Sequence, residues 1–364
     1  MAKQFTYIIL LLAAFVACEE IYRPELDEVD NFLVVEAILI SNQQQNYIRL
    51  YKTIGFNDEN DNYPAVSGAQ VFLVDENDNN IACIEAGPGN YSLNHQLNEG
   101  EAYRLYIEYD GEKYESGVQT VPETPAMDSF YAGFSTRIIT SGASNSTDKI
   151  KEEKGIQMYA DMNYKGGLNH YRFYARKIIQ YIDHYDTLIP PMPEPESHPI
   201  YRWNSYYPTG VFNMAGPPKY STEKNIHKHS IEFFEQDYTK YIHDTMIFSG
   251  WIYYVYQYGI NEDTYDFYSD LNSQLDAEGK IFDPVYIQAK GNILCTSNPE
   301  KVVLGNFEIS SLSEKRFYLN YSKLKDTITA LRSIPYFYYI PEKGYIRDIK
   351  PDFWEHNTRE YPDE

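Results

Sequence analysis

The chain has 364 residues and carries 31 Lys and Arg against 53 Asp and Glu, which gives a formal net charge of -22 at pH 7. Nucleic acid is bound by clustered Lys and Arg, so this charge argues against a nucleic-acid partner. Tyrosine is the outlier of the composition, with 37 residues. Because aromatic side chains suit the half-buried surface of a sheet, the composition favours a β-rich fold, and the length is enough for two domains.

The N-terminus, MAKQFTYIILLLAAFVACEE, predicts a secretory signal peptide over residues 1–17. Lys3 precedes an apolar run that is too short to cross a bilayer, which needs about 20 apolar residues. A small residue followed by Cys18 ends the run, as in the cleavage signal of bacterial lipoproteins. We therefore expect Cys18 to become the lipidated first residue, carrying palmitate-type chains that anchor the protein stably to a membrane. An ordinary signal peptide with a coincidental cysteine is the alternative.

Residues 18–31 form an acidic segment in which six carboxylates surround Arg23. Such a segment cannot bury enough apolar area to fold alone, so we expect a solvated tether. Acidic residues directly after the lipidated cysteine also resemble the surface-export signal of Bacteroidetes lipoproteins. Any charged linker would give the same composition.

Residues 32–124 show short apolar runs separated by turn signals, a pattern that predicts an Ig-like or transthyretin-like β-sandwich. Tyr103, Leu105, Ile107 and Tyr109 alternate with polar residues, and Asp110-Gly111 is the strongest hairpin signal in the chain. The strand-like runs are residues 32–40, 46–54, 69–74, 80–86, 89–93 and 102–116.

The sequence DENDN occurs at Asp58–Asn62 and again at Asp75–Asn79, and could in principle bind calcium. An EF-hand loop needs glycine at its sixth position and glutamate at its twelfth, and neither copy has them. Asp and Asn favour turns because they tolerate left-handed backbone conformations and bond their own backbone. We therefore expect turns at both places.

Residues 125–364 predict a second β-rich domain that carries one amphipathic helix. The helix would begin at the N-cap Asn261 and end near Gly279, with an apolar stripe on its core-facing side. Residues 139–155 predict a polar loop. Residues 189–220 are too rich in proline for an interior strand, and they predict a long, irregular, aromatic-rich loop. Strand-like runs are residues 155–162, 170–182, 229–234, 244–258, 284–289, 292–297, 301–310 and 315–321.

The residues that could contact a ligand are aromatic. In the irregular loop of residues 189–220 they are Tyr201, Trp203, Tyr206, Tyr207 and Phe212, and Trp354 follows near the C-terminus. Each of these residue types is more often a packing residue than a ligand contact.

No catalytic motif is found, and we predict neither a cofactor nor an enzyme. His227 and His229 would project from one face of a strand and form a weak metal pair, but a third ligand is not evident. Cys83 and Cys295 lie in apolar runs and are predicted to be buried, unpaired thiols rather than nucleophiles. A disulfide between them, which an export route would permit, is the alternative. A pair of carboxylates acting as in a glycosidase remains an alternative.

Several stretches together resemble a family of Bacteroidetes lipoproteins known as domain-of-unknown-function family 4249. They are VSGAQVFLVDE with the later GNYSL, then GKIFDPVYIQAKGNILC, VVLGNFEISSLSEKRFYL and the terminal KPDFW. The resemblance implies an extracytoplasmic lipoprotein, often encoded beside a TonB-dependent outer-membrane receptor, and implies no catalytic residue. The C-terminal region here lacks the additional cysteines of many relatives.

Together these features predict an outer-membrane lipoprotein, facing the cell exterior, that serves a TonB-dependent transporter as a binding accessory subunit. It would capture a ligand or cap the transporter. The alternatives are a cell-surface hydrolase of glycans or peptides, and a passive envelope or adhesin component.

Overall fold

The computed structural model describes residues 31–54, 63–126, 129–141, 149–187, 196–206, 212–235, 247–277 and 289–319. Several predictions fall outside these ranges: the signal peptide, Cys18 and nearly all of the tether, the Asp58–Asn62 copy of DENDN, Tyr207, Gly279 and Trp354.

The fold is mainly β, as predicted, and the described part of the chain contains one α-helix. The helix, α2 (Glu262–Ala277), confirms the helix predicted at this position. Its apolar stripe faces the core only in part, since Tyr268 is buried and Leu275 is 47 % exposed. The strands are β1 (Leu33–Ile40), β2 (Asn46–Lys52), β3 (Gln70–Asp75), β4 (Asn80–Gly87), β5 (Asn90–Leu93), β6 (Ala102–Tyr109), β7 (Glu112–Ser116), β8 (Gln119–Thr120), β9 (Ser129–Ser141), β10 (Lys149–Met162), β11 (Tyr171–Thr187), β12 (Glu196–Tyr206), β13 (Asn213–Ala215), β14 (Ile226–Glu235), β15 (Ile247–Gly259), β16 (Ile293–Cys295) and β17 (Val303–Leu319).

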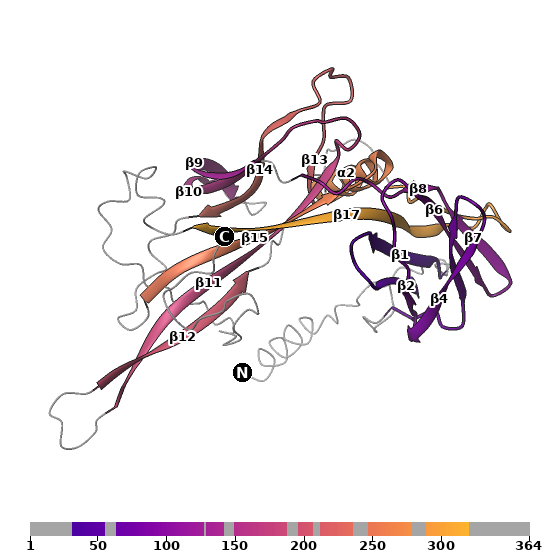
Figure 1. Ribbon diagram of the computed structural model, residues 1–364, viewed down its shortest axis with the longest axis horizontal. Coiled ribbons are helices and arrows are strands. Elements are labelled where there is room, and N and C mark those ends of the chain that lie inside the picture. Colours follow the sequence, from indigo (N-terminus) through magenta and orange to yellow (C-terminus); the bar gives the residue numbers. More distant parts are fainter. Residues whose placement is uncertain are drawn as a thin grey trace, which may run out of the picture.

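Most strands belong to one large curled sheet, in the order β12-β11-β15-β17-β1-β2-β5-β4-β3-β6-β7-β16, with β13 beside β11 and β8 beside β6. Strand β17 connects the two parts of this sheet, which are the long strands β12-β11-β15 and the strands from β1 to β16. The first half of β17 pairs in parallel with β1, from Leu33↔Val303 to Ile40↔Ser310, and the second half pairs antiparallel with β15. Figure 1 shows β17 running from the tightly curled end of the molecule into the fan of long strands β11, β12 and β15.

The curled end encloses the larger hydrophobic core. Strand β1 buries every second residue, and Tyr103, Leu105 and Ile107 of β6 are buried as their alternation predicts. Residues far along the chain complete this core: Ile293 and Cys295 of β16, and Phe307 and Ile309 of β17. The division of the chain between residues 124 and 125 stays a prediction.

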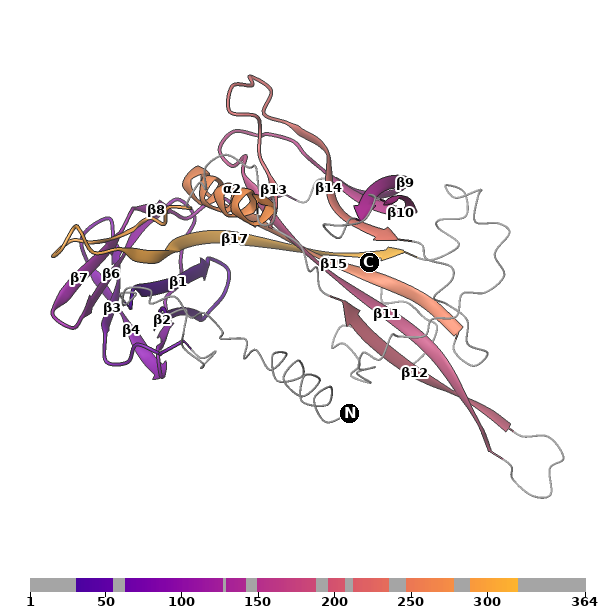
Figure 2. The same cartoon turned by 180° about the vertical axis from the view of Figure 1, so that it is seen from behind.

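A second core lies where the sheet β14-β10-β9 packs on β11 and β15. Figure 2 shows the three strands standing over the long strands, apart from the curled end. The buried residues are Met158, Ala160, Met162, Tyr171, Phe173, Ala175, Ala215, Ile231 and Val255.

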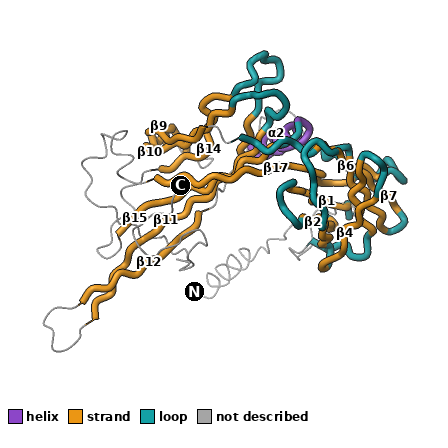
Figure 3. Tube along the Cα trace, viewed as in Figure 1, coloured by secondary structure: helices purple, strands orange, loops and turns teal. Residues whose placement is uncertain are grey.

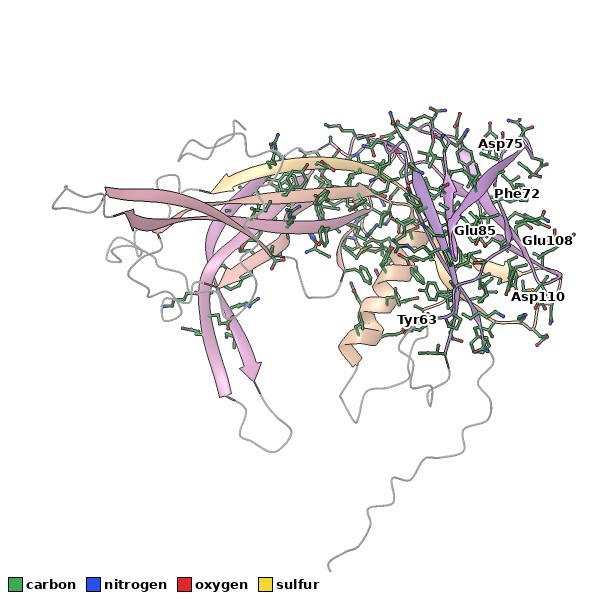
Figure 4. The ribbon with its side chains drawn as sticks, turned by 90° about the horizontal axis from the view of Figure 1, so that it is seen from below. Tyr63, Phe72, Asp75, Glu85, Glu108 and Asp110 are labelled. Atoms are coloured by element: carbon green, nitrogen blue, oxygen red, sulfur yellow. The ribbon has the colours of Figure 1, made fainter. Side chains whose placement is uncertain are left out.

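Two predicted turns are confirmed. Asp75 Oδ1 accepts hydrogen bonds from the backbone amides of Asn77 (2.9 Å) and Asn79 (2.8 Å), and Asp78 takes a positive φ of 61°. Between β6 and β7, Asp110 and Gly111 take φ values of 53° and 76°, the left-handed pair that a tight hairpin requires. Asp75 and Asp110 both lie at the curled end, away from the long strands (Figure 4).

Two loop predictions were wrong. Residues 196–206 form the strand β12, which pairs with β11 from Lys177↔Tyr206 to Thr187↔Glu196. Pro199 is tolerated because β12 is the edge strand of the sheet, so its free side needs no donor. Residues 149–155 belong to β10 and pair with β9 despite their charged side chains. Pairing with a long neighbouring strand outweighs local composition in both cases.

Candidate functional site

The structure contains a polar cavity of about 500 Å³ at the N-terminal end of α2. Figure 3 shows the helix in purple beside the junction between the curled end and the long strands. The walls come from five parts of the chain: Glu99 and Gly100, residues 120–123, residues 167–170, residues 217–219 with Lys224, and the segment Ile260–Glu262 with Tyr265 and Asp266.

Hydrogen bonds to backbone carbonyls hold these walls together. The Gly100 amide donates to the Val121 carbonyl at 3.0 Å, and the Ile260 amide donates to the His170 carbonyl at 3.1 Å. The Asn261 side-chain amide donates to the Thr120 carbonyl at 2.9 Å, so the residue before α2 ties the helix to the curled end. The cavity is therefore fixed by the fold itself rather than by one loop.

Close packing at two glycines shapes the walls. A Cβ on Gly216 would stand 2.8 Å from His170 Cδ2 and 3.0 Å from the Tyr265 ring. Gly167 has a φ of +93°, and a Cβ there would stand 2.8 Å from Glu123 Oε1. Only glycine fits at both positions without moving the neighbouring side chain.

The charges of the cavity are mostly negative. Lys219 Nζ pairs with Asp266 Oδ2 at 3.0 Å, and this hydrogen bond raises the pKa of Lys219. The carboxylates of Glu99, Glu123 and Glu262 make no ion pair among the described residues. These three carboxylates are exposed, and Lys224 also lines the cavity, so four carboxylates face two lysines. The lining therefore carries an excess of negative charge.

One wall is aromatic. The His170 and Tyr265 rings lie 4.8 Å apart, centroid to centroid. Burial lowers the pKa of His170 below its ordinary value of 6.5, although Glu262 and Asp266 act in the opposite direction. The imidazole is therefore neutral near pH 7, and it adds no positive charge to the cavity.

A buried ionic cluster fixes α2 to the sheet. Arg172 Nη2 lies 2.8 Å from Glu308 Oε1, and the Tyr268 hydroxyl donates to Glu308 Oε2 at 2.8 Å. The Arg172 guanidinium also lies over the rings of Tyr258 (4.5 Å) and Tyr268 (4.9 Å). Glu308 is 0 % exposed, and its two carboxylate oxygens contact Arg172 on β11 and Tyr268 on α2. Because α2 carries one wall of the cavity, this cluster also positions that wall.

The predicted aromatic residues lie elsewhere. Phe212 is 38 % exposed and packs on Tyr268 with ring centroids 4.6 Å apart, on the flank of α2 rather than in the cavity. Tyr201, Trp203 and Tyr206 belong to the edge strand β12. Their role in binding stays a prediction, as does that of Tyr207 and Trp354.

The two predicted metal candidates have different surroundings. His227 is exposed, whereas His229 Nε2 lies 2.6 Å from Asn213 Oδ1 and its ring stacks on Phe173. Burial lowers the pKa of His229 to about 4. Lys228 between them has a φ of 53° where the pairing of β10 and β14 is irregular, which interrupts the alternation of side chains. Across the described ranges, no three His, Cys, Asp or Glu side chains are placed to hold a metal ion.

The two cysteines are buried and unpaired, as predicted. Both belong to the larger core, although they lie far apart in the sequence. Burial raises the pKa of the Cys83 thiol to about 12, which suits an inert thiol.

Among the described residues, no helix combines the length and the apolar character needed to cross a bilayer.

Fold and site together define a mainly β protein with a partly open cavity, lined by charged residues, where two parts of one sheet meet. Residues 19–316 match the family described as Domain of unknown function (DUF4249), and the chain belongs to this family. This match confirms the resemblance inferred from the sequence. No curated protein matches the chain.

Sequence reasoning missed the cavity. It recognised the proline-rich segment 121–130 and the start of the helix, but nothing in the sequence places Glu123 beside Gly167 or His170 beside Tyr265. The available signal was the helix start with its acidic first turn, Glu262 and Asp263.

Proposed function

We propose that the protein is an outer-membrane lipoprotein, anchored through Cys18 and facing the cell exterior, that serves a TonB-dependent transporter as a binding accessory subunit. The observation that carries the binding role is the cavity at the start of α2. Its volume of about 500 Å³ lies within the range typical of small-molecule sites, and its polar groups converge from five segments. The transporter partner is an expectation from the family resemblance.

The lipid anchor is supported by the short apolar run that ends at Cys18 and by the acidic segment after it. Metabolic labelling with radioactive palmitate tests this part of the proposal. The native protein should take up label, and a Cys18→Ser variant should not. An unlabelled native protein would show that Cys18 carries no lipid anchor.

The transporter partnership is tested by solubilising outer membranes in a mild detergent and isolating the protein through a C-terminal tag. A TonB-dependent barrel should co-purify in a fixed ratio. Recovery of a lipidated monomer with no barrel would contradict the partnership.

A cell-surface hydrolase is the second candidate, because Glu123 and Glu262 both line the cavity and hydrolysis of glycosidic bonds uses paired carboxylates. Turnover of a glycan or peptide panel that disappears in a Glu123→Gln variant would favour the hydrolase over the binding protein.

We also propose that residues 32–124 form an Ig-like or transthyretin-like β-sandwich. The support is that strands β1, β2 and β5 on one side and β3, β6 and β7 on the other bury their alternate residues in one shared core.

A further inference from the structure

The ion pairs of the cavity leave carboxylates in excess. Glu262 and Asp266 lie one helical turn apart on α2, and Lys219 pairs with Asp266 alone. Glu123 lies against Gly167 across the cavity wall, and Glu99 comes from the turn bonded to Val121. The positive end of the α2 dipole is already met by the two acidic residues of the first turn, Glu262 and Asp263.

The rest of the wall suits an aliphatic chain. Leu168 is half-buried and Pro218 is exposed, so these two lining residues present apolar surface to the cavity, whereas Val121, Pro122, Pro217 and Ile260 are buried. The paired rings of His170 and Tyr265 add a flat aromatic surface, against which a cation or a methylene chain packs favourably.

This arrangement selects among ligand classes. The carboxylates are not gathered around one point, since no group of three metal-ligating side chains occurs in the described part of the chain, so a compact divalent ion does not fit. A small anion would meet four carboxylates against two lysines, one of which already pairs with Asp266. A neutral sugar would partly desolvate the carboxylates without neutralising them.

We infer that the cavity binds a small protonated aliphatic amine of the diamine or polyamine kind, whose ammonium groups pair with Glu123 and Glu262 while its methylenes lie on the apolar lining. This inference rests on the proposed binding function and names its ligand class. A basic amino acid shares the same ammonium chemistry, and its carboxylate would turn to Lys224, a lining residue with no ion pair among those described.

Isothermal titration calorimetry of the mature protein in mild detergent, with spermidine as the probe, tests the inference. Spermidine should bind saturably. The Glu123→Gln and Glu262→Gln variants should each bind about tenfold to a hundredfold more weakly, the effect expected for a lost charge-assisted hydrogen bond. Glu76→Gln, in the exposed turn after β3, is the matched control and should bind as the native protein does. Unchanged melting temperatures show that the variants are folded.

A comparison of lysine with spermidine distinguishes a basic amino acid from a polyamine as the ligand. If a basic amino acid is the ligand, lysine binds more tightly than spermidine, and Lys224→Gln weakens lysine binding but not spermidine binding. If a polyamine is the ligand, Lys224→Gln leaves spermidine binding equal or tighter, because one repulsive charge is gone.

The inference is overturned if neither amine binds, or if both glutamine variants bind as tightly as the native protein. Succinate and glucose serve as anionic and neutral probes. Saturable binding of either one in place of the amines would show that the ligand class is wrong while the binding function stands. If no probe binds, the amine inference falls, and the co-purification experiment separately decides the proposed function.

Discussion

The Tyr91 hydroxyl makes two backbone hydrogen bonds inside the larger core. It donates to the Val66 carbonyl at 2.8 Å and accepts from the Ala69 amide at 3.0 Å, and the residue is 1 % exposed. Tyr91→Phe leaves both backbone groups without their partner, so we expect the free energy of unfolding to fall by about 1–3 kcal/mol in urea denaturation. Tyr106→Phe, whose hydroxyl contacts Glu108 at 3.3 Å on the outer face, should change it by less than about 0.5 kcal/mol. Equal stabilities for the two variants would contradict this role.

His229 makes the stability of the protein depend on pH. Its folded pKa of about 4 lies below the ordinary value of 6.5, so the folded state binds fewer protons than the unfolded state between these values. The stabilisation is complete above pH 6.5 and is lost as the pH falls towards 4. Because the side chain keeps some contact with solvent, we expect a loss on the order of 2 kcal/mol.

The pH effect of His229 is isolated by comparison of variants. Chemical denaturation between pH 4 and 7 should give a shallower pH dependence for His229→Gln than for the native protein. His227→Gln replaces an exposed imidazole and should keep the native slope. A His229→Gln slope identical to the native one would assign the acid sensitivity to carboxylates instead.

Helix α2 depends on one buried ionic cluster. Glu308→Gln leaves the Arg172 guanidinium without its counter-charge, and we expect a loss of about 3–5 kcal/mol of stability. Tyr268→Phe removes one neutral-to-charged hydrogen bond and should cost about 1–3 kcal/mol. Hydrogen exchange should show faster exchange of the α2 amides in both variants. Exchange that is faster elsewhere but unchanged in α2 would mean that the cluster does not hold the helix.

The elements that could be predicted are those whose signals are local. Helix α2 follows from its acidic first turn and apolar spacing, and the Asp75 and Asp110 turns follow from their own side chains. Strand β12 could not be predicted, because Pro199 is acceptable only at an edge and the edge position depends on β11. The cavity depends even more on distant contacts, since its five segments are spread over residues 99–266 of the chain.

At the scale of the whole molecule, β17 and β16 make the curled end depend on the last part of the described chain. They supply Ile293, Cys295, Phe307 and Ile309 to the core around β1. A fragment of residues 31–126 lacks these side chains and exposes the hydrogen-bonding edge of β1. We expect this fragment to show no cooperative thermal transition in circular dichroism, whereas the mature protein melts cooperatively. A fragment that melts cooperatively would show that residues 31–126 are an independent domain.

Native mass spectrometry of the protein extracted from outer membranes tests the central claim, a lipid-anchored protein with a ligand in the α2 cavity, most directly. We expect a chain that begins at Cys18 and is heavier by its acyl groups and by a bound small molecule, and we expect the bound mass to be absent from a Glu123→Gln and Glu262→Gln double variant. A chain without acyl groups, or a bound mass that the double variant retains, would contradict it.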